Sequence, residues 1–359
     1  VTPGGDKASI DVQAGTLRMQ RNADLRGSAT NTVHLRSGTG INFYDLWIFP
    51  FWSLICEDNT SYYVESGASI LTNCWHGPVV LNGALSLTGN NSGISGGFAG
   101  PISGTGALTK TNDHSFYITG TNNTYSGQTI VCGGSLYIAS LRNVGEACSL
   151  GNPMTVADST IKLGSGGQTG GLTYLGTGDT SDRVIDMAGS TGGAKLTQSG
   201  TGKLKLNRLV VSTAGNKSLL LYGDTAGTGE IADTITNGIN ALVSVEKWGT
   251  GAWLLSCTNT YGGATTVNGG SLAYSGNNTL AGALAVKAGT ATISGTNAYT
   301  GTAEIYAGAS GSNGTLRIAS GAKLSCGGNF RIGLSGGCGA FNIDGGAFTN
   351  AQDAGADYN

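Results

Sequence analysis

Apolar residues in this chain occur in pairs that are two positions apart, and glycine-rich corners separate the pairs. Residues 245–274 read VEKWGTGAWLLSCTNTYGGATTVNGGSLAY, in which Trp253 pairs with Leu255 and Leu272 pairs with Tyr274. A spacing of two places both side chains of a pair on one face of a β-strand. The Gly and Asn residues between the pairs supply the positive φ angles that tight turns require. The pattern therefore predicts very short strands joined by corners.

The same pattern recurs along the chain. Full or partial copies lie at 108–137, 196–206 and 293–305. In the first of these copies Lys110 matches Lys247, inward positions stay apolar, and corners stay Gly, Asn or Thr. Self-similarity on a scale of roughly 30 to 50 residues is typical of stacked repeats. We expect an all-β solenoid whose successive coils form parallel sheets.

The repeats suggest two regions. Residues 1–103 are predicted to form N-terminal β-helix coils with an aromatic-rich insertion at 41–76, and residues 104–359 are predicted to form the β-helix that carries the repeats. We expect the two regions to make one continuous solenoid. The first residue is Val1 rather than Met, and we expect the chain to be an excerpt of a longer or processed polypeptide.

The composition indicates what covers the surface. Gly accounts for 63 of the 359 residues without a Gly-X-Y period, which excludes collagen, and charged residues make up 11% against the usual roughly 25%. A surface of Thr, Ser, Asn and Gly suits a secreted or cell-surface fibre better than a cytosolic enzyme. The net charge of −2 argues against a nucleic-acid partner. The apolar run 46–56 is too short for a transmembrane helix.

The segment 41–76 holds three of the five Trp residues of the chain. One interpretation is that these aromatic side chains fill the core at a coil or under a loop. A second is a contact surface for a neighbouring subunit or domain. A third is carbohydrate stacking on Trp47, Trp52 or Trp75. The candidate contact surface consists of Trp47, Phe49, Phe51, Trp52 and Trp75.

The seven cysteines include no Cys-x-x-Cys pair, so a zinc site is not expected. Pairs that are near in sequence are candidate disulfides for an oxidising compartment. The seventh cysteine, Cys257, matches Gly120 of the earlier copy and is interpreted as a small residue in a tight turn. The candidate pairs are Cys56 with Cys74, Cys132 with Cys148, and Cys326 with Cys338.

The repeat at 245–272 resembles the autotransporter-associated β-helix repeat of passenger domains in bacterial surface proteins. The segment 176–204, GTGDTSDRVIDMAGSTGGAKLTQSGTGKL, resembles the stretch that often precedes that repeat. The resemblance covers about residues 104–350 and implies a right-handed parallel β-helix that is exported and displayed. The residues that carry it are Val245, Lys247, Gly249, Thr250, Gly251, Trp253, Leu255, Asn259, Thr260, Tyr261, Gly263, Thr265, Val267, Gly269, Gly270 and Leu272.

The densest acidic group is Asp179, Asp182 and Asp186 around Arg183. Parallel β-helices include polysaccharide lyases and hydrolases, which need converging carboxylates or calcium-binding acids. A regular strand would place Asp182 and Asp186 on the same side. The resemblance makes this segment part of a structural pattern, and we interpret it as a solvated corner with an ion pair. His114 replaces a corner Gly and is expected to be exposed. We therefore predict no catalytic, cofactor-binding or metal-binding residue.

The first functional hypothesis is a structural surface protein, namely a rigid stalk or fibre segment with adhesive or self-associating duty and no enzymatic activity. Its expected partners are further copies or neighbouring domains of the same fibre, with cell-surface glycans as a second class, and its expected location is extracellular or on the outer surface of a bacterium. The alternative is a polysaccharide-binding or polysaccharide-degrading β-helix. A groove lined by converging carboxylates would favour the enzyme, and smooth Thr, Ser and Asn faces would favour the fibre.

Overall fold

The computed structural model describes residues 7–20, 25, 27–44, 50–66, 74–90, 95–301, 304–308, 312–333 and 337–351. Contacts divide the chain into two compact units. The first unit comprises residues 1–175 and 181–184, and the second comprises residues 176–180 and 185–359. The predicted boundary between 103 and 104 falls inside the first unit, where β12 after the boundary pairs with β9 before it.

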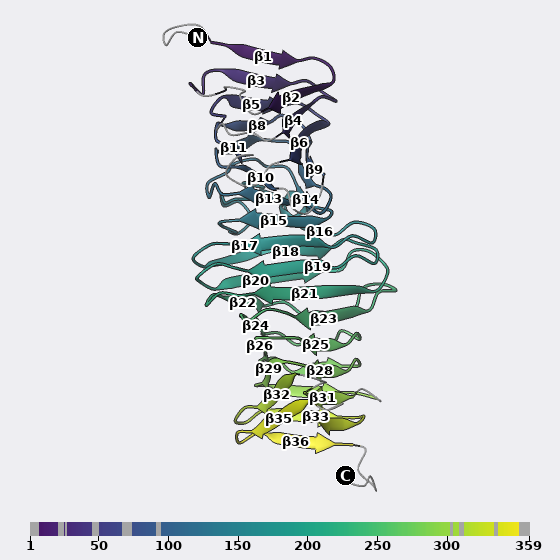
Figure 1. Cartoon of the computed structure of the whole chain (residues 1–359). Coiled ribbons are helices and arrows are strands. Elements are labelled where there is room, and N and C mark those ends of the chain that lie inside the picture. Colours follow the sequence, from purple (N-terminus) through teal and green to yellow (C-terminus); the bar gives the residue numbers. More distant parts are fainter. Residues whose placement is uncertain are drawn as a thin grey trace. The chain divides into compact units, whose positions relative to one another are not determined.

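The first unit consists of parallel sheets whose neighbouring strands come from successive coils (Figure 1). One sheet is formed by β1 (Ser9–Val12), β3 (Thr32–Leu35), β5 (Ser53–Cys56), β8 (Val79–Leu81) and β11 (Ile102–Gly104). A second is formed by β2 (Thr16–Gln20), β4 (Gly40–Tyr44), β6 (Thr60–Ser66), β9 (Leu85–Gly89), β12 (Leu108–Lys110), β14 (Thr129–Val131) and β16 (Ile161–Leu163). A third is formed by β7 (Cys74–Trp75), β10 (Ser95–Phe98), β13 (Ser115–Ile118), β15 (Gly134–Ile138) and β17 (Gly170–Tyr174).

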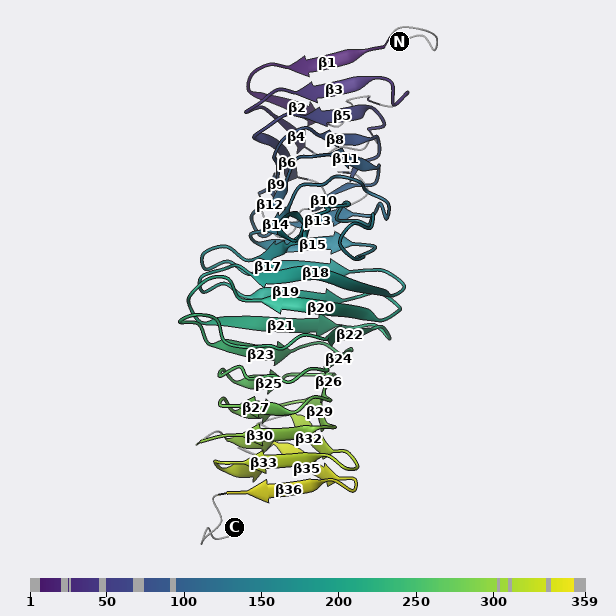
Figure 2. The same ribbon diagram turned by 180° about the vertical axis from the view of Figure 1, so that it is seen from behind.

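The second unit is built in the same way (Figure 2). One sheet is formed by β20 (Leu204–Val210), β22 (Thr228–Ile231), β24 (Ala252–Leu255), β26 (Ser271–Tyr274), β29 (Gly289–Ile293), β32 (Asn313–Ile318) and β35 (Cys338–Ile343). A second is formed by β19 (Ala194–Gln198), β21 (Lys217–Gly223), β23 (Val243–Lys247), β25 (Thr265–Val267), β28 (Leu284–Val286), β31 (Ile305–Ala307) and β34 (Phe330–Ile332). A third is formed by β27 (Asn278–Leu280), β30 (Thr296–Tyr299), β33 (Lys323–Cys326) and β36 (Ala347–Asn350).

Inward side chains form ladders of apolar residues along the stacking direction. Trp253 lies opposite Leu272, and Leu255 lies opposite Tyr274. All four are buried, as the two-residue spacing predicts. Each buried Leu or Val contributes roughly 1.5 to 3 kcal/mol through removal of apolar surface from water. The predicted all-β parallel solenoid is therefore confirmed.

The coils differ in length. Val286 lies opposite Val267, which precedes it by 19 residues, whereas Ile161 lies opposite Thr129, which precedes it by 32 residues. The longer coil contains the single helical turn α1 (Val156–Ser159), whose cap Thr155 accepts a hydrogen bond from the Asp158 N–H. The strand β18 (Asp179–Met187) contributes residues to both units.

The corners adopt the backbone conformation that the glycine pattern predicts. Gly249 and Gly270 have φ angles of 72° and 63°. Asn112, which matches Gly249 in the earlier copy, has a φ of 58°. Asn tolerates this left-handed region better than other residues with a side chain, so the corner is preserved without glycine. Within the residues that the structure describes, no helix has the length and apolar character needed to cross a membrane.

Candidate functional site

The predicted aromatic contact surface is wrong for two of its five residues. The Trp75 side chain is fully buried and that of Trp52 is 8% exposed, and Trp75 Nε1 donates a hydrogen bond to the Trp52 carbonyl oxygen at 2.9 Å. Both residues fill the core, Trp75 from β7 opposite Phe98 of β10 and Trp52 from the position just before β5. Phe51 is 43% exposed, and its ring centroid lies 5.5 Å from that of His76. Trp47 and Phe49 lie outside the described residues.

Several described aromatic residues of this segment fill the core, which agrees with the first of the three interpretations. The ring of Phe43 stacks on that of Tyr62 with centroids 4.7 Å apart, and Trp75 meets Phe43 edge-on at 6.2 Å. Tyr62 also meets the edges of Phe98 and Phe116 at 5.0 and 5.6 Å. Such edge-on and offset contacts are the favoured arrangements of aromatic pairs. Burial raises the pKa of Tyr62 well above its ordinary value, so its phenol stays neutral.

None of the three candidate disulfides is joined in the structure. All seven cysteines lie in described segments, and each is a free thiol. Cys56 ends β5 and Cys74 begins β7, so they belong to different sheets. Burial raises the pKa of Cys56 to about 12 and that of Cys74 to about 11, so both are protonated at neutral pH.

The acidic segment of β18 does not place its carboxylates on one side. Asp182 is exposed and accepts a hydrogen bond from the Val144 N–H at 2.8 Å. Asp186 is buried and accepts from the N–H and hydroxyl of Ser212 at 3.1 and 2.8 Å. The prediction of a shared face is wrong because residues 183–187 are all buried and the alternation stops there.

Arg183 is buried rather than paired at a solvated corner, so that interpretation is also wrong. Its guanidinium donates to the backbone carbonyl oxygens of Leu150, Gly151 and Glu146 at 2.6, 2.8 and 3.1 Å. These acceptors lie more than 30 residues earlier in the chain. The side chain therefore anchors the loop that follows β15.

His114 is buried, which contradicts the prediction of an exposed corner residue. Burial, with a further contribution from the nearby charge of Lys110, lowers the pKa of His114 to about 3. The ring lies against Gly89, where a Cβ would come within 3.1 Å of it. A neutral imidazole thus fills the space beside a residue that has no side chain.

The lysines of the repeat have a structural role that the sequence pattern does not reveal. Lys110 Nζ donates to the carbonyl oxygens of Thr111, Asn112 and Gly133 at 2.9, 2.7 and 2.8 Å. Burial lowers the pKa of Lys110 to about 7, while the charge of Asp113 opposes the shift. The sequence signal for this role is that Lys occupies the same position in two copies of the repeat.

The matching Lys247 makes the same kind of contact. Its Nζ donates to the carbonyl oxygens of Trp248, Gly249 and Gly269 at 2.6, 3.0 and 3.3 Å. Burial lowers the pKa of Lys247 to about 8. Each of these ammonium groups satisfies acceptors at a corner of its own coil and at the corner of the next coil.

A ladder of buried asparagines connects three successive coils of the second unit. Asn259 Nδ2 donates to Asn278 Oδ1 at 2.7 Å, and Asn278 Nδ2 donates to Asn297 Oδ1. The Asn259 N–H also donates to Asn278 Oδ1 at 2.8 Å, and Asn259 Oδ1 accepts from the Ile235 N–H at 2.9 Å. Side-chain hydrogen bonds between these asparagines therefore run along the stacking direction.

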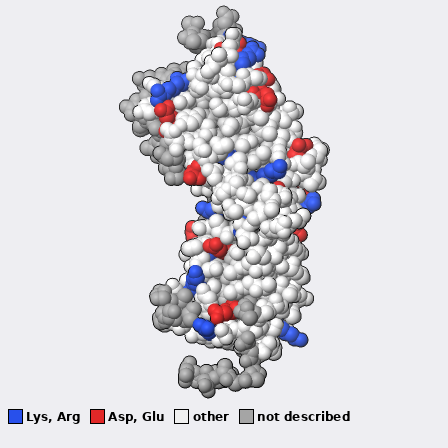
Figure 3. Space-filling view, turned by 90° about the vertical axis from the view of Figure 1, so that its right-hand side faces the viewer, with Lys and Arg blue, Asp and Glu red and all other residues white. Residues whose placement is uncertain are grey.

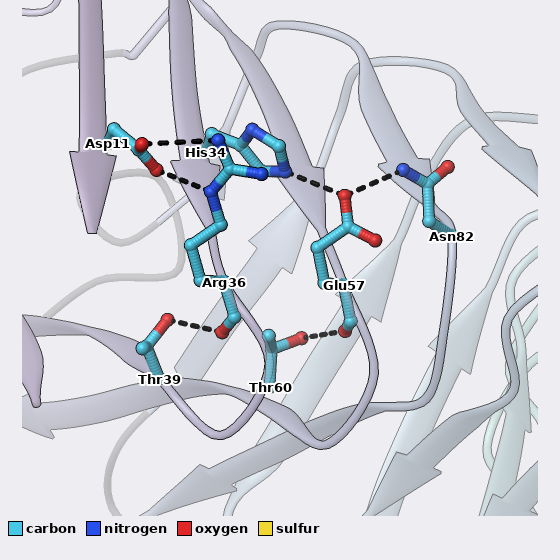
Figure 4. Close-up of polar contacts among 7 residues, drawn as sticks. All are labelled: Asp11, His34, Arg36, Thr39, Glu57, Thr60 and Asn82. Atoms are coloured by element: carbon cyan, nitrogen blue, oxygen red, sulfur yellow. Dashed lines mark hydrogen bonds and ion pairs between the residues drawn. The ribbon is translucent and has the colours of Figure 1, made fainter. Parts of the chain in front are cut away.

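A cluster of charged and polar side chains lies at the neighbouring strands β1, β3, β5 and β8 of the first unit and directly after them (Figure 4). We call it the N-terminal polar cluster, and it consists of Asp11, His34, Arg36, Glu57 and Asn82. Arg36 Nε donates to Asp11 Oδ1 at 2.7 Å and Arg36 Nη2 to Asp11 Oδ2 at 3.1 Å. His34 Nε2 lies 2.6 Å from Glu57 Oε1, which also accepts from Asn82 Nδ2 at 3.0 Å.

The N-terminal polar cluster is positioned by the parallel register of its strands. Asp11 lies opposite His34 in the β1–β3 pair, and residues that follow the strands, such as Arg36 and Glu57, continue the ladder. The hydrogen bonds from Asn82 and His34 hold the pKa of Glu57 below its ordinary value, and the hydrogen bond from Arg36 does the same for Asp11. The cluster is thus a fixed array of both signs of charge.

On the face that Figure 3 shows, Lys, Arg, Asp and Glu are scattered among uncharged residues. Among the described residues, no three His, Cys, Asp or Glu side chains lie together as a metal-binding group. The candidate functional site is the N-terminal polar cluster.

Comparison with known proteins identifies the repeats. A family model for the passenger-associated transport repeat matches residues 108–138, 245–273 and 288–309. These segments contain the corners of Lys110 and Lys247. No solved structure matches the chain.

A curated relative shares sequence with half of the chain. The adhesin BmaC autotransporter of Brucella suis biovar 1 (strain 1330) is 33% identical over 183 residues. The match covers 49% of this chain and 5% of the relative. The chain thus spans a small part of the length of that protein.

Proposed function

We propose that this autotransporter passenger repeat chain is an adhesive, non-catalytic segment of a protein displayed outside a bacterial cell. The observation that carries the proposal is the N-terminal polar cluster. Side chains from three coils hold one another in place there, as Arg36 holds Asp11 and His34 holds Glu57. A preorganised surface loses little side-chain entropy when a partner binds.

The name of the relative supports the adhesive part of the proposal, because it is an adhesin and shares 33% identity with half of this chain. The passenger repeats support the extracellular location. The low fraction of charged residues, 11%, also suits a surface that is exposed outside the cell.

The positions of the carboxylates in β18 support the proposal that the chain is not catalytic. Asp182 and Asp186, the acids that a polysaccharide-cleaving site would use, each accept hydrogen bonds from backbone N–H groups. Asp182 is exposed and Asp186 is buried, so the two carboxylates do not converge on one substrate position.

Self-association is a further part of the proposal. The formal net charge is −2 for 359 residues, so electrostatic repulsion between copies is weak. Sedimentation velocity of the purified chain over a concentration series tests this part. A sedimentation coefficient that is independent of concentration and corresponds to one chain would contradict it.

The adhesive role is tested with beads that carry the purified full chain. We expect these beads to attach to cultured animal cells more than beads that carry an unrelated β-solenoid do. The double variant Asp11→Asn, Glu57→Gln should reduce attachment, and Asp344→Asn, whose carboxylate pairs with Arg317 in the second unit, serves as the control. Equal attachment of both kinds of bead would overturn the proposal. Release of reducing ends from polysaccharides incubated with the chain would overturn its non-catalytic part.

A further inference from the structure

The outward face of β19, β21 and β23 carries a pair of aromatic rings. Tyr222 and Trp248 lie in neighbouring coils, and the Trp248 N–H donates to the Leu221 carbonyl oxygen at 2.9 Å. Their ring centroids are 6.1 Å apart and their planes are inclined by 13°. Neighbouring strands are about 4.8 Å apart, so the rings are displaced sideways and each leaves part of a face uncovered.

Trp248 differs from the other tryptophans that the structure describes. It is 37% exposed, whereas Trp52, Trp75 and Trp253 are all buried. Its indole is fixed, because Nε1 donates to Glu246 Oε2 at 3.0 Å. Packing in the core does not explain this indole, because it is both exposed and held in place. A bound ligand would explain it.

Polar groups surround the two rings. Lys195 Nζ lies 4.6 Å from the centroid of the Tyr222 ring, a cation–π contact. The Ser218 hydroxyl donates to Glu246 Oε1 at 3.3 Å. The face is therefore an aromatic surface with an ammonium group on one side and a hydroxyl and a carboxylate along its edge.

The row of Tyr222 and Trp248 continues with polar side chains. The Asn268 N–H donates to the Lys247 carbonyl oxygen at 2.8 Å, and the Lys287 N–H donates to the Val267 carbonyl oxygen at 2.9 Å. Asn268 and Lys287 thus hold the same position in the next two coils. Each coil offers one side chain of this row to solvent, at intervals of about 4.8 Å.

We propose that this face binds a pyranose polysaccharide whose chain runs along the stacking direction of the coils. A pyranose ring has an apolar C–H face, which suits the exposed parts of Tyr222 and Trp248, and hydroxyl groups at its edge, which suit Asn268, Lys287 and Lys195. The spacing of the coils is close to the length of one pyranose residue. The residues of this face belong to the second unit, so the inference goes beyond the N-terminal polar cluster and adds a second binding site to the proposed adhesive function.

The same observations argue against a peptide or protein partner. The backbone of β21 pairs with β19 and β23, and that of β23 pairs with β21 and β25, so these strands offer no free edge to an added strand. A stable protein interface buries about 1,200 Å² or more around an apolar centre, which one exposed indole does not provide.

The test uses the purified full chain and four variants. Trp fluorescence is titrated with mannan, dextran and hyaluronan, and binding is measured independently by affinity electrophoresis in gels containing each polysaccharide. We expect at least one of the three to bind, and we expect Trp248→Ala and Tyr222→Ala to weaken that binding about tenfold or more, the effect of losing one aromatic contact. Trp248→Phe should retain part of the affinity.

The matched control is Tyr117→Ala. Tyr117 and Tyr137 form an outward aromatic stack in the first unit, with centroids 4.2 Å apart and planes inclined by 17°, and this stack has closely overlapped faces. Its removal should leave polysaccharide binding unchanged. Thermal unfolding of each variant, followed by circular dichroism, establishes that lost binding does not reflect lost structure.

Three results would overturn the inference. They are the absence of binding to all three polysaccharides, binding that Trp248→Ala leaves unchanged, and a dimer of the native chain that Trp248→Ala converts to a monomer, since a second copy would then occupy the face. If beads that carry the chain attach to cells but the chain binds none of the polysaccharides, this inference is wrong and the proposed function stands. If the chain binds a polysaccharide but the beads do not attach to cells, the proposed function is wrong and this inference stands.

Discussion

Lys110 and Lys247 hold the same position in two copies of the repeat, and each ammonium group donates to three backbone carbonyl oxygens. In both copies one of the acceptors belongs to the following coil, Gly133 for Lys110 and Gly269 for Lys247. The lysine therefore joins consecutive coils at a corner, where the strands themselves are interrupted. This contact explains why a charged residue recurs at a buried position.

Replacing Lys247 by Met should destabilise the chain. The change removes the donor to three partly buried carbonyl acceptors, and we expect the free energy of unfolding to fall by about 2 kcal/mol. Lys323→Met, at an exposed position of β33, is the control and should change it by less than about 0.5 kcal/mol. Urea unfolding followed by circular dichroism measures both. A Lys247→Met chain as stable as the native one would show that the corner does not need its donor.

Asn278 is the central member of the asparagine ladder, so Asn278→Ala should be costly. The substitution removes the acceptor of the Asn259 side chain and the donor to Asn297 Oδ1. We expect a loss of about 2 to 3 kcal/mol, since two buried amides lose a partner. Thr279→Ala, at the exposed neighbouring position, should be nearly neutral. Similar urea midpoints for the two variants would contradict this account.

Arg183→Met should loosen the loop that contains Glu146, Leu150 and Gly151. The guanidinium is the donor to all three carbonyl groups, and its removal should cost about 3 kcal/mol. Hydrogen exchange at residues 142–151 should become faster, while Arg208→Met, an exposed position in the second unit, should leave this segment protected. Unchanged exchange in the Arg183 variant would rule out the anchoring role.

Stability should fall in acid because of the N-terminal polar cluster. The folded-state pKa values of Glu57 and Asp11 lie below their ordinary values, so the stabilisation from both carboxylates is fully present above about pH 4.3, the usual pKa of an unfolded Glu. It is lost as the pH falls through the lower pKa values of the folded state. Glu57→Gln should therefore flatten the dependence of the urea midpoint on pH between 6 and 3. An equally steep dependence in the variant would assign the acid sensitivity to other groups.

The strands and corners of this fold could be predicted from local sequence because both depend on near neighbours. Trp253 and Leu255 both point inward because residues two apart lie on the same face of a strand. Asn112 replaces a corner glycine because it tolerates a positive φ. Comparing the two copies of the repeat also aligns Lys110 with Lys247. The sequence does not show which carbonyl oxygens the two lysines contact.

The candidate site could be predicted less well, because it depends on contacts between coils. The sequence predicts an exposed His114, yet its ring enters the space that Gly89 leaves in the preceding coil. Arg183 finds its acceptors more than 30 residues earlier in the chain. The aromatic residues Trp52 and Trp75 pack inward for the same reason, since only the stacked coils bring Phe43, Tyr62 and Trp75 together.

The asparagine ladder repeats at intervals of 19 residues, from Asn259 to Asn278 to Asn297. A gene segment of that length can be lost or duplicated by unequal crossing-over without shifting the remaining inward residues out of phase. Selection can therefore lengthen or shorten such a protein one coil at a time, and lineages can adjust its reach while every intermediate still folds.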